Sequence, residues 1–223
     1  MASHSALGPS LTRKSHVFLT GRPGVGKTTA IRRIVELLQN EKKPQGDGGG
    51  GIDGFYTQER RERSRRVGFD VVTLNGERQS LADVMPDAPD PSRRRPRYVV
   101  GRYGVNLEKF ERSVLPILRQ YVDKSSSHAH GQVLIVDEIG KMEAFSKEFL
   151  TNTRQILESN FVEPNVNVVG TVPSAGGHFS RELQALLKLI ESHPACAVLE
   201  VTEENRQRIP ARVVAMLQGD GSV

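Results

Sequence analysis

The sequence is poor in aromatic residues and in cysteine. Its 223 residues include no tryptophan, and aromatic residues make up only 5% of the chain. Proteins that bind single-stranded nucleic acid stack bases on aromatic side chains, so this shortage argues against such binding as the main activity. The single cysteine, Cys196, excludes an intrachain disulfide and argues against a cysteine-based metal site. Its apolar surroundings, ACAVLEV, favour a buried strand residue over a reactive thiol.

Long hydrophobic runs are also missing. No apolar segment approaches the roughly 18 residues of a membrane-spanning helix. Residues 1–14 lack the long apolar core of a secretory signal, and we interpret them as a flexible leader. We therefore expect an intracellular, cytoplasmic protein without a membrane partner. Targeting of the leader to an organelle is left open, because the segment is rich in serine and free of acidic residues.

Positive charge is in modest excess and locally clustered. There are 31 Lys and Arg against 26 Asp and Glu, which gives a net charge of +5. The excess suits anionic ligands but does not require nucleic acid, so nucleic acid is not the expected partner, and its binding is left open as an alternative. Arginines gather at 60–66 (RRERSRR) and at 93–97 (RRRPR), and each segment is typical of a solvated loop.

Apolar strand patterns alternate with helical patterns along the chain. Strands are predicted at HVFLT, VLIVD, NVNVVGTVP and AVLEVT, and helices at 28–40, 106–122, 146–160, 180–191 and 203–217. This alternation predicts an α/β fold with a mostly parallel sheet flanked by helices.

One stretch interrupts the alternation. In residues 52–104, GFYTQE and VGFDVVTL flank a charged turn and predict an antiparallel hairpin. Residues 83–97, rich in proline and arginine, predict an exposed excursion, and RYVVG is a further candidate strand. We interpret 52–104 as an insertion within a single domain that spans residues 15–218.

The segment GRPGVGKT at 21–28 fits the pattern G-x-x-x-x-G-K-[ST] of a phosphate-binding loop, or Walker A motif. Its glycines allow positive φ, so that successive N–H groups can point at one anion, and the following helix aims its positive end at the same place. Lys27 is a candidate to reach the β- and γ-phosphates, and Thr28 to hold Mg²⁺. The predicted nucleotide-binding residues of this segment are Gly21, Arg22, Pro23, Gly24, Val25, Gly26, Lys27, Thr28 and Thr29.

A phosphate-binding loop needs an acidic partner for the metal ion. Asp137 and Glu138 end the apolar segment LIVDE, the Walker B arrangement. Asp137 is predicted to hold Mg²⁺ together with Thr28, and Glu138 to activate the attacking water. Lys27 and Glu138 are thus the predicted catalytic residues.

An anion site of this kind also needs positive side chains that act on the transition state. Candidates are Arg22, Arg102, Lys141 and Arg206, each of which is also typical of an ordinary surface residue. Lys141 closely follows the acids in DEIGKME, and Arg206 follows the last predicted strand in VTEENR.

Taken in order, HVFLTGRPGVGKTT, GFYTQE, VGFDVVTLNG, VLIVDEIGKME, VVGTVP and VTEENR resemble the cancer-related nucleoside-triphosphatase family of small THEP-type proteins. The resemblance covers roughly residues 15–215. It implies a RecA-like α/β fold with an added hairpin and slow, Mg²⁺-dependent hydrolysis of several nucleoside triphosphates. It also implies nucleotide-binding segments at 21–28 and 133–140, which adds Gly140 to the site.

The sequence supports a nucleoside-triphosphatase that hydrolyses ATP, GTP, CTP and UTP to the diphosphate and phosphate. No base-reading motif is visible, so relaxed base choice is expected. Two alternatives stay open: a nucleotide or nucleoside kinase, in which the arginine-rich excursion closes as a lid, and a nucleotide-dependent switch that binds a protein or RNA partner through its basic segments.

Overall fold

A computed structural model of the chain describes residues 15–40, 51–86, 95–122, 132–159 and 166–219. The predicted leader 1–14, most of the glycine-rich segment at 46–51, and Arg93 and Arg94 of the second basic cluster lie outside these ranges.

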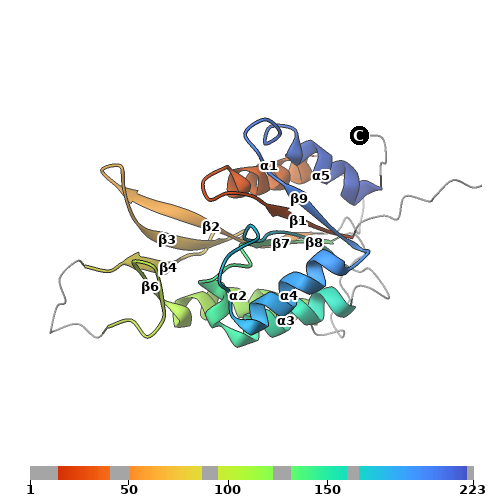
Figure 1. The fold of residues 1–223 in the computed structure, drawn as a ribbon. Coiled ribbons are helices and arrows are strands. Elements are labelled where there is room, and N and C mark those ends of the chain that lie inside the picture. Colours follow the sequence, from red (N-terminus) through yellow and green to blue (C-terminus); the bar gives the residue numbers. More distant parts are fainter. Residues whose placement is uncertain (1–14, 41–50, 87–94, 123–131, 160–165, 220–223) are drawn as a thin grey trace, which may run out of the picture.

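Within the described residues, nine strands form one mixed sheet (Figure 1). Their order across the sheet is β5-β6-β4-β3-β2-β7-β8-β1-β9. The strands of the parallel part are β2 (Ile52–Glu62), β7 (Gln132–Asp137), β8 (Val166–Thr171), β1 (His16–Thr20) and β9 (Cys196–Glu200). The antiparallel part consists of β3 (Arg65–Thr73), β4 (Arg78–Val84), β5 (Val99–Val100) and β6 (Tyr103–Val105), joined to β2. The predicted α/β fold with a mostly parallel core and an added hairpin is therefore confirmed.

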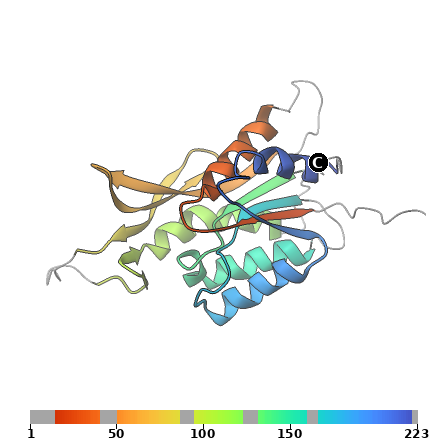
Figure 2. The same cartoon turned by 45° about the horizontal axis from the view of Figure 1, so that its top comes forward.

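Helices cover both faces of the parallel strands (Figures 1 and 2). One face carries α1 (Lys27–Asn40) and α5 (Ile209–Gln218). The other carries α2 (Leu107–Val122), α3 (Lys147–Ser159) and α4 (Arg181–Ser192). Pro116 lies inside α2 without ending it.

Two hydrophobic clusters fill the space between the sheet and its helices. Strand side chains alternate between them because successive residues of a strand point to opposite faces. In β7, Val133 and Ile135 pack with α1 and α5, while Leu134 and Val136 pack with α2 and α3. Every residue of β7 after Gln132 is buried, as the continuous apolar run LIV predicts for a central parallel strand.

Strand β8 lies between β1 and β7. The strand that leads into the phosphate-binding loop and the strand that carries Asp137 are thus not neighbours. Parallel pairing nevertheless brings their carboxyl ends to the same edge of the sheet, where the loops of α/β proteins bind ligands.

The structure differs from the sequence-based expectation at the start of the last helix and in one strand that was not predicted. The last helix begins at Ile209, not at residue 203, because Asn205 ties the preceding residues into turns: its side chain accepts from Thr202 N at 2.8 Å and donates to Glu200 O at 2.8 Å. Residues 78–84 form a strand, β4, that was not predicted, and it takes in the start of the excursion expected at 83–97. Its side chains alternate too weakly in hydropathy to be recognised without its partner β3.

Part of the segment 52–104, interpreted from the sequence as an insertion, belongs to the parallel sheet. The first half of β2 pairs in parallel with β7, from Ile52 opposite Val133 to Tyr56 opposite Asp137. From Thr57 onward, β2 continues past the end of β7 and carries β3 with it, beyond the carboxyl edge of the sheet (Figure 1). The hairpin turns at Arg63 and Ser64, whose φ values are 44° and 66°. This left-handed conformation suits Asn-Gly and costs an ordinary residue about 1 kcal/mol.

No helix among the described residues is long and apolar enough to cross a membrane.

The buried His16 in β1 makes the stability of the fold sensitive to acid. Its Nδ1 accepts a hydrogen bond from Val168 N at 3.2 Å. Burial, and then the positive charge of His193, lower the pKa of His16 from 6.5 to about 4. The unfolded chain therefore binds a proton below pH 6.5 that the folded chain refuses until about pH 4, so this contribution is complete above pH 6.5 and is lost as the pH falls toward 4.

We expect His16→Asn, whose amide oxygen can still accept from Val168 N, to reduce the fall in unfolding free energy between pH 6.5 and 4 by roughly 3 kcal/mol. Urea unfolding at a series of pH values measures this slope. Parallel pH profiles for the variant and the wild-type chain would contradict the assignment.

Candidate active site

The loop between β1 and α1 has the backbone of an anion cradle. Gly21, Gly24 and Gly26 adopt φ values of 141°, 80° and 111°, a region that residues with a Cβ atom rarely enter. A Cβ on Gly21 would lie 2.6 Å from Val201 O, so this glycine also lets the loop pack against the chain after β9. The first amides of α1 have no acceptor within the helix, and they face the cradle together with the positive end of the helix dipole.

Lys27, the first residue of α1, folds back over this loop. Its Nζ donates to the carbonyl oxygen of Gly21 at 2.9 Å and to that of Arg22 at 3.5 Å. The ammonium group is therefore held at the rim of the cradle, where it can exchange carbonyl oxygens for phosphate oxygens.

Asp137 is fully buried at the end of β7. Its Oδ1 accepts a hydrogen bond from Thr171 Oγ1 on the neighbouring strand β8. Burial raises the pKa of Asp137 to about 6, and the negative charge of Glu138 adds to this, whereas the hydroxyls of Thr171 and Thr28 and the charge of Lys27 lower it. The carboxylate thus sits where a positive ligand would strongly favour its ionised form.

Glu138 faces a second carboxyl group, that of Glu143 in the short helix η1 (Glu143–Phe145). A Cβ built on Gly140 would lie 2.8 Å from both Glu138 Oε1 and Glu143 Oε2, so the two side chains converge over this glycine. Burial raises the pKa of Glu138, although Lys27 opposes the shift. Burial and the charges of Glu138 and Asp137 raise the pKa of Glu143 to about 8. The pair therefore favours a state in which Glu143 keeps a proton and Glu138 is the group that ionises.

A cavity of about 510 Å³, which we call the nucleotide cavity after its expected ligand, opens above these groups. One wall is the phosphate-binding loop and the start of α1, and the floor includes Glu138. The opposite wall is the overhanging hairpin, because β2 runs past Asp137 at this edge. The lining residues are Gly21, Pro23, Gly24, Gly26, Lys27, Thr28, Thr29, Arg32, Tyr56, Thr57, Gln58, Glu59, Arg66, Phe69, Glu138, Pro173 and Ser174.

The structure gathers most of the predicted nucleotide-binding residues around this cavity. Arg22 is exposed on the loop, and Val25 is half-buried against Gly21. Asp137 lies beneath the cavity at the end of β7, and Gly140 lies beside Glu138.

The other candidate cationic residues, Arg206, Lys141 and Arg102, lie in different places. The Cδ atom of Arg206 is 3.9 Å from a Cβ built on Gly26, so Arg206 borders the phosphate-binding loop. Lys141 lies over the ring of Phe179, 5.3 Å from its centroid, and lines a different cavity. Arg102 lines a third cavity, at the outer end of the hairpin.

Several residues in or near the cavity were not predicted as site residues. Arg32 of α1 lies over the ring of Tyr56, 5.7 Å from its centroid, and Arg66 of the hairpin pairs with Glu59 at 2.7 Å. Glu143 is buried beside Glu138. Arg66 was included in the first basic cluster but interpreted as part of a solvated loop. The acidic spacing in DEIGKME was the visible signal for Glu143.

The residues at the end of β7 fit a magnesium ion. The Oδ2 atom of Asp137 is buried and accepts no hydrogen bond of good geometry from the part of the chain that the structure describes, although the Thr28 hydroxyl is close enough to lower the pKa of the acid. No group of three or more His, Cys, Asp or Glu side chains suited to a metal occurs among the described residues. A hydroxyl and one carboxylate match the way Mg²⁺ is bound, with water and phosphate oxygens as its other ligands.

A glycine-rich turn that joins a strand to a helix, opposite an acid on another parallel strand, is the arrangement that defines P-loop NTPases, and this chain has that fold. A family model described as NTPase matches residues 16–214, so the chain belongs to this NTPase family.

The relatives agree with this assignment. The cancer-related nucleoside-triphosphatase of Homo sapiens is 42% identical over 203 residues, which cover 91% of this chain and 96% of that protein. Nucleoside-triphosphatase THEP1 of Aquifex aeolicus is 35% identical over 204 residues, covering 91% and 98% of the two chains. The resemblance inferred from the sequence motifs is confirmed.

Solved structures show the same fold. The crystal structure of THEP1 from Aquifex aeolicus aligns with a TM-score of 0.66 at 35% identity and covers 91% of this chain and 99% of that one. The solution structure of a human cancer-related nucleoside triphosphatase aligns with a TM-score of 0.68 at 41% identity, covering 91% and 97%.

The contact of Glu138 and Glu143 over Gly140 yields a testable expectation. Gly140→Ala places a methyl group 2.8 Å from a carboxylate oxygen of each acid and so displaces Glu138 from the cavity floor. We expect phosphate release from ATP to fall roughly 10- to 100-fold, the scale for misplacing a reacting group by about 1 Å, while nucleotide affinity changes little. Steady-state turnover and calorimetric titration measure the two quantities.

Gly51→Ala is the matched control, because the nearest atom to its added methyl group is Gln132 Nε2, at 4.0 Å. If both alanine variants turn over at the same rate, the contact over Gly140 does not position Glu138.

Proposed function

We propose that this chain is a Mg²⁺-dependent nucleoside-triphosphatase that hydrolyses several nucleoside triphosphates to the diphosphate and phosphate, with Glu138 as the base that activates water. The observation that carries the proposal is the cavity in which the phosphate-binding loop, Lys27 and Glu138 meet. The names of the relatives point to the same reaction class.

Phosphate recognition rests on the loop and on one ammonium group. The amides that follow Gly24 and Gly26 suit the phosphate oxygens of the nucleotide, and these glycines leave room for the ligand, since a Cβ on Gly24 would meet no atom within 4 Å. Lys27 suits the β- and γ-phosphate oxygens, whose negative charge grows or shifts as the bond to the γ-phosphorus breaks. Because these groups are fixed before the substrate arrives, they stabilise the transition state without reorganisation.

Thr28 and Asp137 would hold the magnesium ion. When bound, Mg²⁺ supplies positive charge to the β- and γ-phosphate oxygens. The buried Oδ2 of Asp137 is the atom best suited to it, because this oxygen has no good hydrogen bond from the described residues.

Glu138 is suited to take a proton from water. It lines the cavity next to the phosphate-binding loop, and burial raises its pKa, which makes the carboxylate a stronger proton acceptor. A base works best when its pKa is near the working pH, because it is then both ionised and a good proton acceptor. The oxygens of Glu143 and Glu138 converge over Gly140, and the charge of Glu138 helps to raise the pKa of Glu143, so Glu138 is the one suited to ionise.

Relaxed base choice follows from the distribution of these contacts. The groups that recognise the substrate gather at its phosphates, which all nucleoside triphosphates share. The main test measures phosphate release from ATP, GTP, CTP and UTP with Mg²⁺ and without an acceptor. Release that requires an added acceptor would instead identify a kinase, and no release from any triphosphate would overturn the proposal.

Loss of the loop ammonium should abolish most of the rate. We expect Lys27→Ala to lower turnover by roughly 100-fold or more, the scale for removing one preorganised charge at a transferring phosphoryl group. Exposed Lys147, the first residue of α3, does not line the cavity and provides the matched control as Lys147→Ala. Near-normal turnover in Lys27→Ala would contradict the assigned role.

Loss of the base should separate binding from chemistry. Glu138→Gln keeps the size and hydrogen-bonding capacity of the side chain but cannot accept the proton. We expect nucleotide to bind with unchanged affinity, within about twofold, while phosphate release drops by roughly 100-fold. Calorimetry and single-turnover phosphate release measure the two quantities. An equal loss of both would make Glu138 a structural or metal-binding residue.

A further inference from the structure

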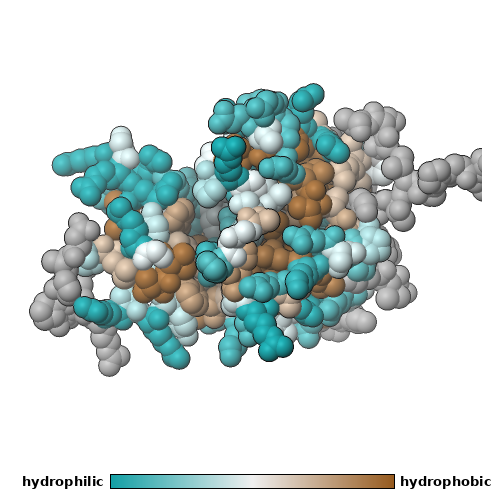
Figure 3. Space-filling view, viewed as in Figure 1, coloured by the Kyte–Doolittle hydropathy of each residue, from teal (hydrophilic) through white to brown (hydrophobic). Residues whose placement is uncertain are grey.

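The cavity at the outer end of the hairpin, which we call the tip cavity, is separate from the phosphate-binding loop. Its volume is about 400 Å³, and it is lined by Glu62, Arg63, Arg65, Arg66, Val67, Val84 and Arg102. Four arginines thus face a single glutamate around one hollow. Figure 3 shows hydrophilic side chains gathered at this end of the molecule, over the tip of β2 and β3.

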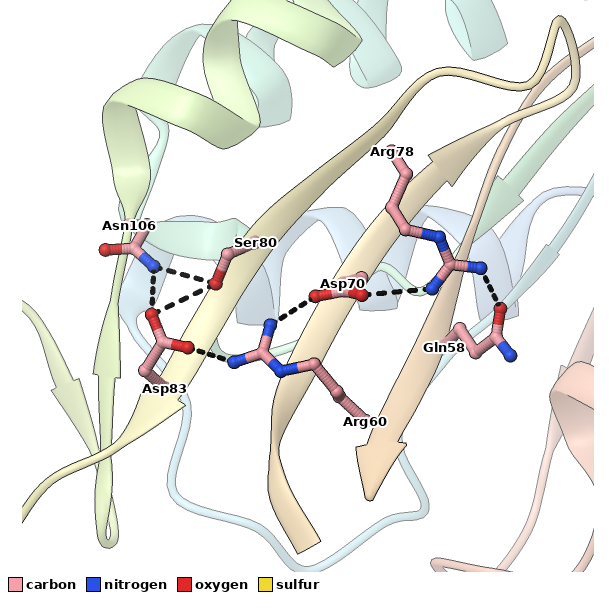
Figure 4. Close-up of polar contacts among 7 residues, drawn as sticks. All are labelled: Gln58, Arg60, Asp70, Arg78, Ser80, Asp83 and Asn106. Carbon is pink, nitrogen blue, oxygen red and sulfur yellow. Dashed lines mark hydrogen bonds and ion pairs between the residues drawn. The ribbon is translucent and has the colours of Figure 1, made fainter. Parts of the chain in front are cut away.

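The arginines of the hairpin fall into two groups. On the body of the hairpin, Arg60 and Arg78 are held in a network that crosses three strands and reaches the start of α2 (Figure 4). Arg60 binds both Asp70 and Asp83, and Arg78 binds Asp70 at 3.0 Å. The network is completed by Gln58, Ser80 and Asn106. These charges are used inside the fold.

The arginines at the tip of the hairpin differ from Arg60 and Arg78. Arg63, Arg65 and Arg102 are exposed, and none of them forms an ion pair within the described part of the chain. Their mutual repulsion destabilises the tip unless an anion is present. Arg63 is also held with a positive φ of 44° in the hairpin turn, a strained conformation of the kind that persists at binding sites.

The fourth arginine is placed firmly. Arg66 pairs with Glu59 at 2.7 Å and lies over the ring of Phe69, 5.5 Å from its centroid. It lines the tip cavity and also the nucleotide cavity. This guanidinium lies between the two cavities and offers donors to a ligand in either one, since its planar fork has five N–H groups.

We propose that this tip cavity is a second anion site that binds ligands carrying several phosphate groups, held by Arg63, Arg65, Arg66 and Arg102. Arginine forks match phosphate oxygens in pairs, and the four of them converge on a hollow rather than on a flat face. The site goes beyond the proposed hydrolysis and does not depend on it. The phosphates can belong to a nucleic-acid strand or to a free polyphosphate.

The test compares two triple variants in a Lys27→Ala background, which weakens phosphate binding at the other cavity equally in both. The tip variant is Arg63→Ala, Arg65→Ala and Arg102→Ala. The matched control is Arg33→Ala, Arg112→Ala and Arg154→Ala, which removes the same charge from exposed helix positions. The probes are a fluorescein-labelled 15-residue oligouridylate RNA, followed by anisotropy, and inorganic tripolyphosphate, followed by calorimetry.

We expect the tip variant to bind at least tenfold more weakly than the control. For RNA the slope of log affinity against log salt should change from about −3 in the control to about −1 in the tip variant, because each lost phosphate contact removes about 0.7 from a single-strand slope. RNA binding that tripolyphosphate does not displace identifies a nucleic-acid backbone as the ligand. Direct tripolyphosphate binding with the same dependence on the tip arginines identifies a free polyphosphate.

The single change Arg65→Glu repeats the test with minimal risk to folding, since this side chain is exposed and unpaired among the described residues. It should weaken binding of the same probe by more than Arg65→Ala does. Equal affinities and salt slopes in the tip and control variants would overturn the proposal. So would the failure of both probes to bind the control below about 1 mM at low salt.

Discussion

The placement of a carboxylate in the interior, at the end of the central strand, is the constraint on which the site depends. Asp137 is fully buried, yet it carries an oxygen that accepts no good hydrogen bond from the described residues. Such a group is costly in a fold unless a ligand compensates it. Thr171 from β8 and Thr28 from α1 approach the same carboxyl group. Elements β7, β8 and α1, which are far apart in the sequence, therefore meet at the side chain of Asp137. Parallel pairing of β7 with β8, and of β8 with β1, makes this meeting possible.

Three acidic side chains, beginning with Asp137, follow one another closely along the chain. Asp137, Glu138 and Glu143 lie within seven residues, and burial raises the pKa of all three. Only one of the latter two can ionise easily, because their oxygens converge over Gly140. In the proposed function, one short segment would thus supply a metal-binding acid, a base and a neighbouring acid that keeps its proton. The separate roles come from differences in surroundings, since the side chains themselves are nearly alike.

The hairpin connects this chemistry to the rest of the surface. Its inner half belongs to the parallel sheet, and its outer half overhangs the nucleotide cavity because β2 is longer than β7. The ionic network of Figure 4 ties strands β2, β3 and β4 together. One edge of the nucleotide cavity is therefore a hairpin whose strands are joined by ion pairs. Arg66 lies on this hairpin, between the nucleotide cavity and the tip cavity.

The amino-acid sequence by itself determined the phosphate-binding loop, the acids at 137 and 138, and the α/β alternation. These features are local: glycine spacing, a strand before the loop, a helix after it, and a continuous apolar run are all readable within a dozen residues. The family could be recognised for the same reason, from short motifs in a fixed order.

Only the tertiary structure decided which distant side chains share the site. Arg102 and Lys141 were reasonable candidates by sequence, but sheet order places each of them at another cavity. Tyr56 and Arg66 reach the nucleotide cavity because β2 pairs with β7 and then overhangs its end, and no local pattern encodes that register. Glu143 became important through its burial and its approach to Glu138 over Gly140, and both depend on how η1 packs beside α2 and α3. Local patterns fix backbone shape, whereas neighbours across the sheet are fixed by pairing and packing between segments that are far apart in the chain.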